Sequence, residues 1–272
     1  MRFACPQAPI IGGGVLHSKA ASSSPRSQSL GLRTHHDSRR ARVTAQARDR
    51  SEHDSDVPQI SEDWRAFRAH LVAEETHNTP TMDGRWAHEL AAPEKGCLLV
   101  ARRFDMGAFN HSVVLLLEHG DTIGTRGLIL NHPLPVGMLK DNHPEGKVPE
   151  VACYVGGPVE MRTVTLMHDR RIPGATEIVQ GVYYGGNTAE LAELSPEQKW
   201  KRTRMFLGTS CWAPHQLSAE LHDAPAWYIL AASKDVIFGK GNGMDLYDED
   251  YTRSFWEDII RISNVDFPEG KC

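Results

Sequence analysis

The chain has 272 residues, of which 40% are hydrophobic and 24% are charged, and these proportions exclude a fully disordered or a fibrous protein. The longest apolar runs reach about five residues, whereas a membrane-spanning helix needs about 20, so no span is expected. The formal net charge is -5, and beyond residue 50 acidic side chains outnumber basic ones, which argues against direct nucleic-acid binding.

Residues 1–50 are rich in Arg and Ser and poor in acidic residues, a composition typical of a disordered organelle transit peptide. The tripeptide Val43-Thr44-Ala45 is similar to plastid processing sites, which favours the chloroplast stroma over the mitochondrion. A disordered N-terminus without a targeting role is the alternative interpretation.

Residues 51–94 are expected to hold a linker and then a docking helix. Ser61 can cap this helix, and the spacing of Trp64, Phe67 and Leu71 places them on one helical face. We expect that face to dock on the rest of the protein. Residues 79–93 contain Pro, Gly and Thr and are predicted to be a connection.

From Gly96 onward, short runs rich in Val, Leu and Ile alternate with turn residues, a pattern that predicts strands. The nine expected strands are residues 97–102, 112–118, 127–131, 151–155, 164–168, 178–184, 205–209, 227–231 and 236–238. Their number excludes a helical bundle.

Helices are expected late in the chain, at residues 195–200, at residues 214–222 and from about Asp248 onward. The last helix carries an apolar stripe, Tyr251, Phe255 and Ile259 flanked by Trp256 and Ile260, that should pack on the sheet. Because strands come first and no regular βαβ alternation is present, the predicted class is α+β in a single domain of residues 95–264, followed by a tail at 265–272.

The segment from Gly208 to Trp212 is predicted to join a strand to a helix, which is the geometry of a nucleophile elbow. A helix N-terminus would favour the Cys211 thiolate, and His215 is near enough in sequence to act as its base. This pair supports a thiol-dependent hydrolase or transferase. The segment lacks the second glycine of G-x-S-x-G, and no acid is placed as a third member, so a tight turn with a buried thiol is the alternative.

Two further turns follow predicted strands. In Gly156-Gly157-Pro158, the proline removes a backbone donor and no G-K-[ST] follows, so a sharp turn is expected rather than a phosphate loop. In Asn131-His132-Pro133, Asn131 is either a turn residue or a ligand contact.

Metal and cofactor sites are not expected. The 14 histidines include no H-E-x-x-H, and His111 and His119 bracket a strand that would hold them roughly 26 Å apart. His215 and His222 are separated by two helical turns, about 10 Å. The five scattered cysteines lack zinc-ligand spacing.

Five segments, taken in order, resemble motifs of the YqgE/AlgH family, and the match extends from about Lys95 to Asn264. The segments are Gly96-Cys-Leu-Leu-Val-Ala, Phe109-Asn-His-Ser-Val-Val-Leu-Leu-Leu-Glu-His, Gly127-Leu-Ile-Leu-Asn-His-Pro, Val155-Gly-Gly-Pro-Val, and Phe206-Leu-Gly-x-x-x-Trp-Ala-Pro-x-Gln-Leu-x-x-Glu-Leu. The resemblance implies a strongly bent, barrel-like, mostly antiparallel sheet flanked by helices. It also implies a family of uncertain activity, with plastid-targeted plant members and one bacterial branch labelled as a transcriptional regulator.

The resemblance bears on which residues matter. Many members have small residues where this chain has Ser210, Cys211 and His215, which weakens the cysteine-enzyme hypothesis. The motif positions that carry over are Asn131, Pro133, Gly157, Pro158, Trp212 and Gln216.

Our leading hypothesis is therefore a non-catalytic domain that binds a partner protein or a small ligand at a rim formed by the turns after Asn131, Gly156 and Gly208. The thiol enzyme is the second hypothesis. A nucleic-acid-binding regulator is the third, and its basic cluster would be Lys199, Lys201, Arg202 and Arg204.

Overall fold

A computed structural model of the chain describes residues 64–76, 84–134, 151–223, 225–239 and 249–266, which all belong to one compact unit. The predicted transit peptide, the linker with Ser61, the expected helix start at Asp248 and the last tail residues, 267–272, lie outside these ranges. Within them, no helix combines the length and the apolar character needed to cross a membrane.

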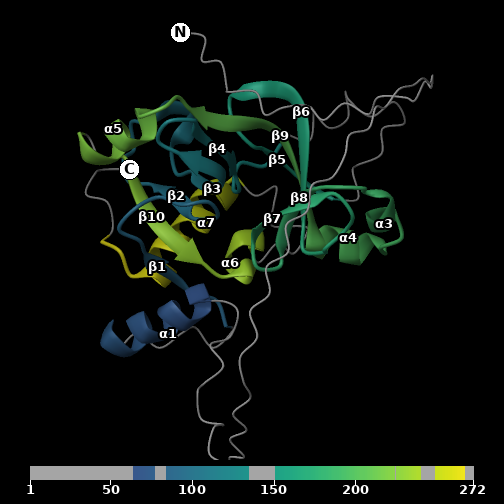
Figure 1. The fold of residues 1–272 in the computed structure, drawn as a ribbon, viewed down its shortest axis with the longest axis horizontal. Helices are drawn as coiled ribbons and strands as arrows, with labels where there is room; N and C mark the ends of the chain where they lie inside the picture. Colours follow the sequence, from purple (N-terminus) through teal and green to yellow (C-terminus); the bar gives the residue numbers. More distant parts are fainter. Residues whose placement is uncertain (1–63, 77–83, 135–150, 224, 240–248, 267–272) are drawn as a thin grey trace, which may run out of the picture. The chain divides into compact units, whose positions relative to one another are not determined.

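In the described part of the chain, ten strands form one open, mostly antiparallel sheet, which confirms the predicted α+β class (Figure 1). The strands are β1 (Ala87–Glu89), β2 (Leu98–Ala101), β3 (Val113–Gly120), β4 (Gly124–Ile129), β5 (Ala152–Val155), β6 (Val159–His168), β7 (Ala175–Val179), β8 (Val182–Gly185), β9 (Thr203–Trp212) and β10 (Trp227–Ala232). Their order is β1-β10-β2-β3-β4-β9-β6-β8-β7, and β5 pairs in parallel with β9 off this path. The long strand β9 therefore holds together the two halves of the sheet.

The helices lie around this sheet and are mostly short. They are α1 (Trp64–Thr76), the 3-10 helix η1 (Gly107–Phe109), α3 (Ala189–Ala192), α4 (Pro196–Arg202), α5 (Gln216–His222), α6 (Lys234–Phe238) and α7 (Tyr251–Ser263). The predicted cap of α4 is confirmed, because the Ser195 side chain accepts a hydrogen bond from the Gln198 amide.

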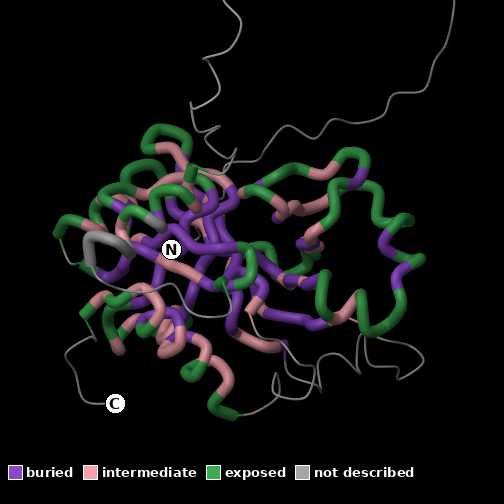
Figure 2. The backbone as a smooth tube through the Cα atoms, turned by 90° about the horizontal axis from the view of Figure 1, so that it is seen from below, coloured by how far each residue is buried: buried purple, intermediate pink, exposed green. Residues whose placement is uncertain are grey.

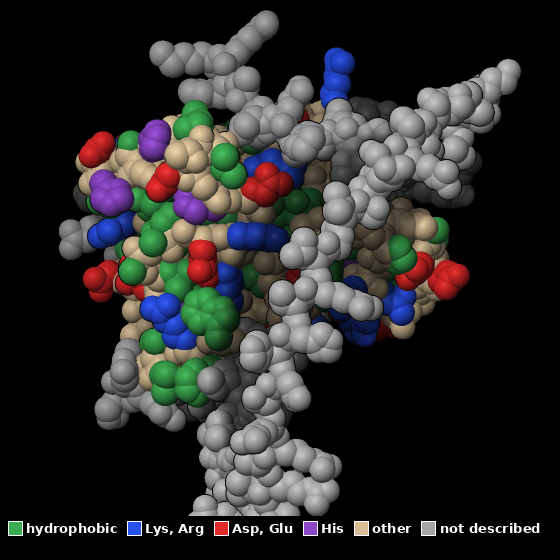
Figure 3. Space-filling model, viewed as in Figure 1, with side chains coloured by type: hydrophobic (Ala, Val, Ile, Leu, Met, Phe, Trp, Pro, Cys, Tyr) green, Lys and Arg blue, Asp and Glu red, His purple; other side chains and the backbone are tan. Residues whose placement is uncertain are grey.

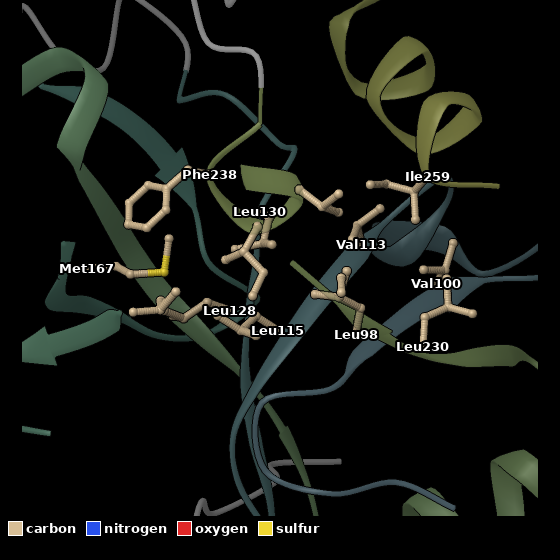
Figure 4. Close-up of a cluster of buried hydrophobic side chains, with 14 of the residues drawn as sticks. Leu98, Val100, Val113, Leu115, Leu128, Leu130, Met167, Leu230, Phe238 and Ile259 are labelled. Carbon is tan, nitrogen blue, oxygen red and sulfur yellow. The ribbon is translucent and has the colours of Figure 1, made fainter. Parts of the chain in front are cut away.

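The larger core lies between the sheet and the helices α6 and α7, and buried residues concentrate in the strands (Figure 2). Ile259 reaches from α7 toward Val113 and Val100 of the sheet (Figure 4). Trp256 is fully buried, and its indole N–H donates to the Ala101 carbonyl at 2.8 Å. The predicted packing of the last helix is confirmed, and each such buried side chain stabilises the fold by about 1.5–3 kcal/mol.

Two predicted strands are wrong. Residues 236–238 belong to α6, because the Ser233 hydroxyl accepts from the Val236 amide and so caps a helix there. Residues 178–184 are not one strand but parts of β7 and β8. Val179 pairs with Val182, so Gln180 and Gly181 form a two-residue turn, and the positive φ of 73° at Gly181 suits glycine.

The expected docking face of α1 is also wrong. The aromatic stripe is exposed, with exposed fractions of 48% for Trp64, 50% for Phe67 and 43% for Leu71. The helix instead contacts the domain through buried Ala69 and through Arg65, whose guanidinium donates to the Glu94 carboxylate and to the Gly96 carbonyl. The strand β1 lies in the segment that was predicted to be a connection, and it pairs with β10 at one end of the sheet.

Candidate functional site

The three motif turns named above lie together in the fold. The Val155 amide donates to the His132 carbonyl at 2.8 Å, and the Ile129 amide donates to the Gly156 carbonyl at 2.9 Å. The Gly156 amide in turn donates to the Leu207 carbonyl at 2.8 Å, next to Gly208. Backbone hydrogen bonds thus join the turns after Asn131, after Gly156 and at Gly208.

Close backbone contact explains the glycines of these turns. A Cβ atom on Gly157 would lie 2.3 Å from the Thr209 carbonyl carbon, so no larger residue fits without a shift of the backbone. Gly208 has a positive φ of 74°, and a Cβ atom there would lie 2.5 Å from the Gly157 carbonyl oxygen. The glycines therefore allow the backbones of these turns to pack closely. This close packing fixes the positions of the neighbouring side chains.

Beside these turns lies an open hollow of about 520 Å³. Its lining residues are Gly107, Ala108, Ile129, His132, Pro133, Val155, Gly157, Pro158, Met161 and Thr252. They come from η1, β4, β5, β6, α7 and the two turns after Asn131 and Gly156. None of them is an acidic or basic residue apart from His132, so the hollow is largely apolar.

His132 is the one titratable residue of this lining, and its environment keeps it neutral. Its Nε2 atom lies 3.1 Å from the hydroxyl of buried Ser112, and the backbone of Asn110 also hydrogen-bonds to the ring. Burial lowers the pKa of His132, because the charged imidazolium would lose its hydration, and this effect outweighs the hydrogen bond with the Asn110 backbone, which acts to raise the pKa. Near pH 7 the hollow therefore carries no formal charge.

Asn131 is fully buried and does not line the hollow. Its Oδ1 atom accepts from the Val113 amide at 2.9 Å, and its Nδ2 atom donates to the carbonyls of His111 at 2.7 Å and Thr252 at 2.8 Å. These contacts make Asn131 a link between β3, the end of β4 and α7, next to the hollow.

Trp212 and Gln216 also lie outside the hollow, around the carboxylate of Glu220. The Glu220 carboxylate accepts from the indoles of Trp212 at 3.0 Å and Trp227 at 2.9 Å, and from the Gln216 amide at 3.0 Å. Phe109 packs on Trp212 with ring centroids 6.0 Å apart, and it ends the 3-10 helix whose first two residues line the hollow. Of the motif positions, only Pro133, Gly157 and Pro158 line the hollow.

Neither the nucleophile elbow nor the alternative, a tight turn with a buried thiol, is formed at Cys211, which is partly exposed. Strand β9 continues through Trp212, so Cys211 lies inside the strand, opposite Arg126, and α5 begins only at Gln216. The neighbouring Ser210 is fully buried, and its hydroxyl donates to the Gly156 carbonyl at 3.1 Å. The helix N-terminus that would favour a Cys211 thiolate is therefore missing at this position.

The other two cysteines of the described ranges, Cys97 and Cys153, are poor nucleophiles. Burial raises the pKa of the Cys97 and Cys153 thiols to about 12, so both are protonated near pH 7. Within the same ranges, no three His, Cys, Asp or Glu side chains are grouped as a metal ion would require.

The four residues of the basic cluster do not share one exposed surface: Lys199, Lys201 and Arg202 lie in the last turn of α4, whereas Arg204 is buried in β9. Arg204 is only 3% exposed, and it donates to the carbonyls of Trp200 and Thr203 at the end of α4 and to the Phe238 carbonyl at the end of α6. Lys201 pairs with Glu197 at 2.8 Å. On the face seen in Figure 3, acidic and basic side chains are interspersed. A row of phosphates would find no continuous basic stripe there.

Sequence reasoning missed part of the lining. His132 is part of the motif Asn131-His132-Pro133, and this motif was the sequence signal from which its place in the lining could have been predicted. Met161 and Thr252 gave none, because they reach the hollow only when β6 and α7 fold against residues far away in the chain.

Comparison with known proteins adds the following. A family model described as AlgH-like matches residues 97–267. A UPF0301 protein of Chlorobium phaeobacteroides is 34% identical over 150 residues, which cover 54% of this chain and 76% of the relative. A UPF0301 protein of Chlorobaculum tepidum is 32% identical over 170 residues, which cover 61% of this chain and 86% of the relative.

The fold is similar to a crystal structure of a protein from Corynebacterium diphtheriae. The two chains are 25% identical with a TM-score of 0.50, and the match covers 66% of this chain and 92% of the other. Both α1 and β1 precede the residues that the family model matches.

Proposed function

This chain belongs to the AlgH-like family, and we propose that it is a non-catalytic domain whose hollow binds a small, uncharged and largely apolar molecule. The observation that carries the proposal is the uncharged lining of the hollow. A ligand with a formal charge would lose its hydration there without gaining a counter-ion, whereas an apolar group would be stabilised by leaving water.

The volume of about 520 Å³ supports a small molecule as the ligand, because such sites commonly measure about 300–1,000 Å³. Both sides of the His132 ring are already engaged, by Ser112 and by the Asn110 backbone. We therefore assign His132 a role in shaping the wall rather than in proton transfer. The composition of residues 1–50 supports the chloroplast stroma as the compartment, with the mitochondrion as the alternative.

Two residues of β6 allow a matched test. Met161 lines the hollow and is 40% exposed, whereas Val164 is 56% exposed and is not part of the lining. We expect Met161→Glu to weaken binding of Nile red, an uncharged apolar dye, by at least about tenfold, because a carboxylate without a partner disfavours an apolar group beside it. The control Val164→Glu should bind the dye as the parent does, in a fluorescence titration.

Three outcomes would contradict the proposal. The parent does not bind the dye, or both variants bind it as the parent does, or both lose it equally. If the parent does not bind the dye but binds an apolar peptide instead, the occupant of the hollow is a segment of a partner protein. Circular dichroism of each variant checks that the fold is retained.

A further inference from the structure

Met161 is held at the hollow by an irregular stretch of β6. Val159 pairs with Thr209 and Val164 with Leu207, so the four residues between them on β6 face the single residue Gly208 on β9. Glu160, the first of the four, has a positive φ of 51°, a strained conformation for a residue with a side chain. Such a bulge re-aims a side chain, here that of Met161.

The Met161 sulfur lies against the backbone of Gly208. A Cβ atom placed on Gly208 would lie 2.8 Å from it, so this side of the thioether is closely packed. The rest of the side chain borders the hollow and the solvent, because Met161 lines the hollow and is 40% exposed. Among the described methionines, Met167 is fully buried and Met106 and Met205 are partly buried, which leaves Met161 as the most exposed.

We infer that Met161 is an oxidation site through which hydroperoxides control the binding of the apolar ligand. In the reaction, the thioether sulfur attacks one peroxide oxygen, an S–O bond forms, and the O–O bond breaks. With hydrogen peroxide the proton of the attacked oxygen passes to the other oxygen, which leaves as water. The sulfur is oxidised by two electrons, the peroxide is reduced, and methionine sulfoxide reductases can reverse the change.

The sulfoxide changes the character of the wall. An apolar and flexible thioether becomes a polar group with a strong hydrogen-bond acceptor. Because Gly208 leaves no room on its side, the new oxygen must face the hollow or the solvent beside it. An apolar ligand in contact with this wall would then lie against a group that prefers water, so its affinity falls. This inference rests on the proposed function.

The test treats the folded protein with increasing hydrogen peroxide and follows two readouts. Peptide mass mapping records which methionine first gains an oxygen atom, and a Nile red titration records the affinity. We expect the Met161 peptide to be oxidised before those of Met106 and Met167, and the affinity to fall by about tenfold as it is oxidised. Methionine sulfoxide reductases A and B, one for each sulfoxide epimer and supplied with a dithiol as reductant, should restore binding. The affinity of Met161→Leu for the dye, measured before and after peroxide treatment, should be the same in both measurements.

Two results would overturn the inference alone. Met161 is oxidised no faster than Met106, or Met161 is oxidised first while the dye affinity stays unchanged. In both cases, the proposed function still stands if the untreated Met161→Glu variant has lost its binding of the dye. If untreated Met161→Glu binds the dye as the parent does, the proposed function fails and the inference fails with it.

Discussion

Asn131 occupies a motif turn, yet its side chain faces inward rather than toward a ligand. The Asn131 side chain bonds to one backbone N–H and two backbone carbonyls. In addition, the Thr252 hydroxyl donates to the backbone carbonyl of Asn131 at 2.9 Å. Buried backbone groups that lose such a partner cannot turn to water instead. Asn131 therefore has a structural role in this motif, because it links the sheet to α7. The link also fixes the position of Thr252, which is part of the lining of the hollow.

Replacement of Asn131 by Ala tests this link. We expect Asn131→Ala to lower the free energy of unfolding by about 3 kcal/mol, because it removes three hydrogen bonds, one of them to the buried Val113 amide. Urea denaturation followed by tryptophan fluorescence measures the change. The control is Asn187→Ala, which removes a hydrogen bond to the Ala189 amide at an exposed position and should cost less than about 1 kcal/mol. Equal effects of the two substitutions would refute the assigned role.

Most elements of the sheet could be predicted from the sequence, because their Val- and Leu-rich runs are bounded by turn residues. In each exception, a contact that hydrophobic periodicity does not encode decides the structure. A run as short as Val236–Phe238 suits a strand or a helix equally, and the cap at Ser233 decides between them. The strand β1 has only three residues and exists because β10 offers it an edge. The exposed face of α1 likewise depends on the Arg65 contacts, which no periodicity encodes.

The contact between α1 and β1 depends on pH through His88. His88 is 4% exposed, stacks on Trp86 with ring centroids 5.6 Å apart, and has no hydrogen-bond partner for either ring nitrogen among the described residues. Burial lowers the pKa of His88, and the positive charges of Arg68 and Arg65 lower it further. The unfolded chain then binds a proton at a pH where the folded chain does not, so stability is lost as the pH falls below about 6.5.

The prediction compares unfolding at about pH 7.5 with unfolding at about pH 5.5, for the parent and for His88→Leu. The parent should lose about 1 kcal/mol more than the variant, since the variant has no imidazole to protonate at this position. The other histidines with lowered pKa values, His111 and His132, are present in both proteins and cancel in the difference. The same loss in both proteins would count against the role of His88.

At the scale of the whole molecule, the hollow exists only in the folded chain. Gly107, Ile129, Val155, Met161 and Thr252 all line it, although they come from five separate elements. The sequence identified two of the motif turns that border it, but no spacing rule brings η1, the β6 bulge and α7 to the same place. Three separate contacts do so: β6 pairs with β9, Phe109 of η1 packs on Trp212 of β9, and Asn131 bonds to Thr252 of α7. For this reason the apolar chemistry of the site became visible only in the fold.

The most direct test of an uncharged binding hollow is a methyl NMR titration of the full chain with a small, uncharged, apolar probe such as indole. We predict shifts concentrated on the methyl groups of Ile129, Val155 and Met161, which line the hollow. Exposed methyl groups elsewhere, those of Ile123 and Val164, should stay in place. Shifts confined to Ile123 and Val164, or no shifts at probe concentrations that saturate other apolar sites, would contradict the account.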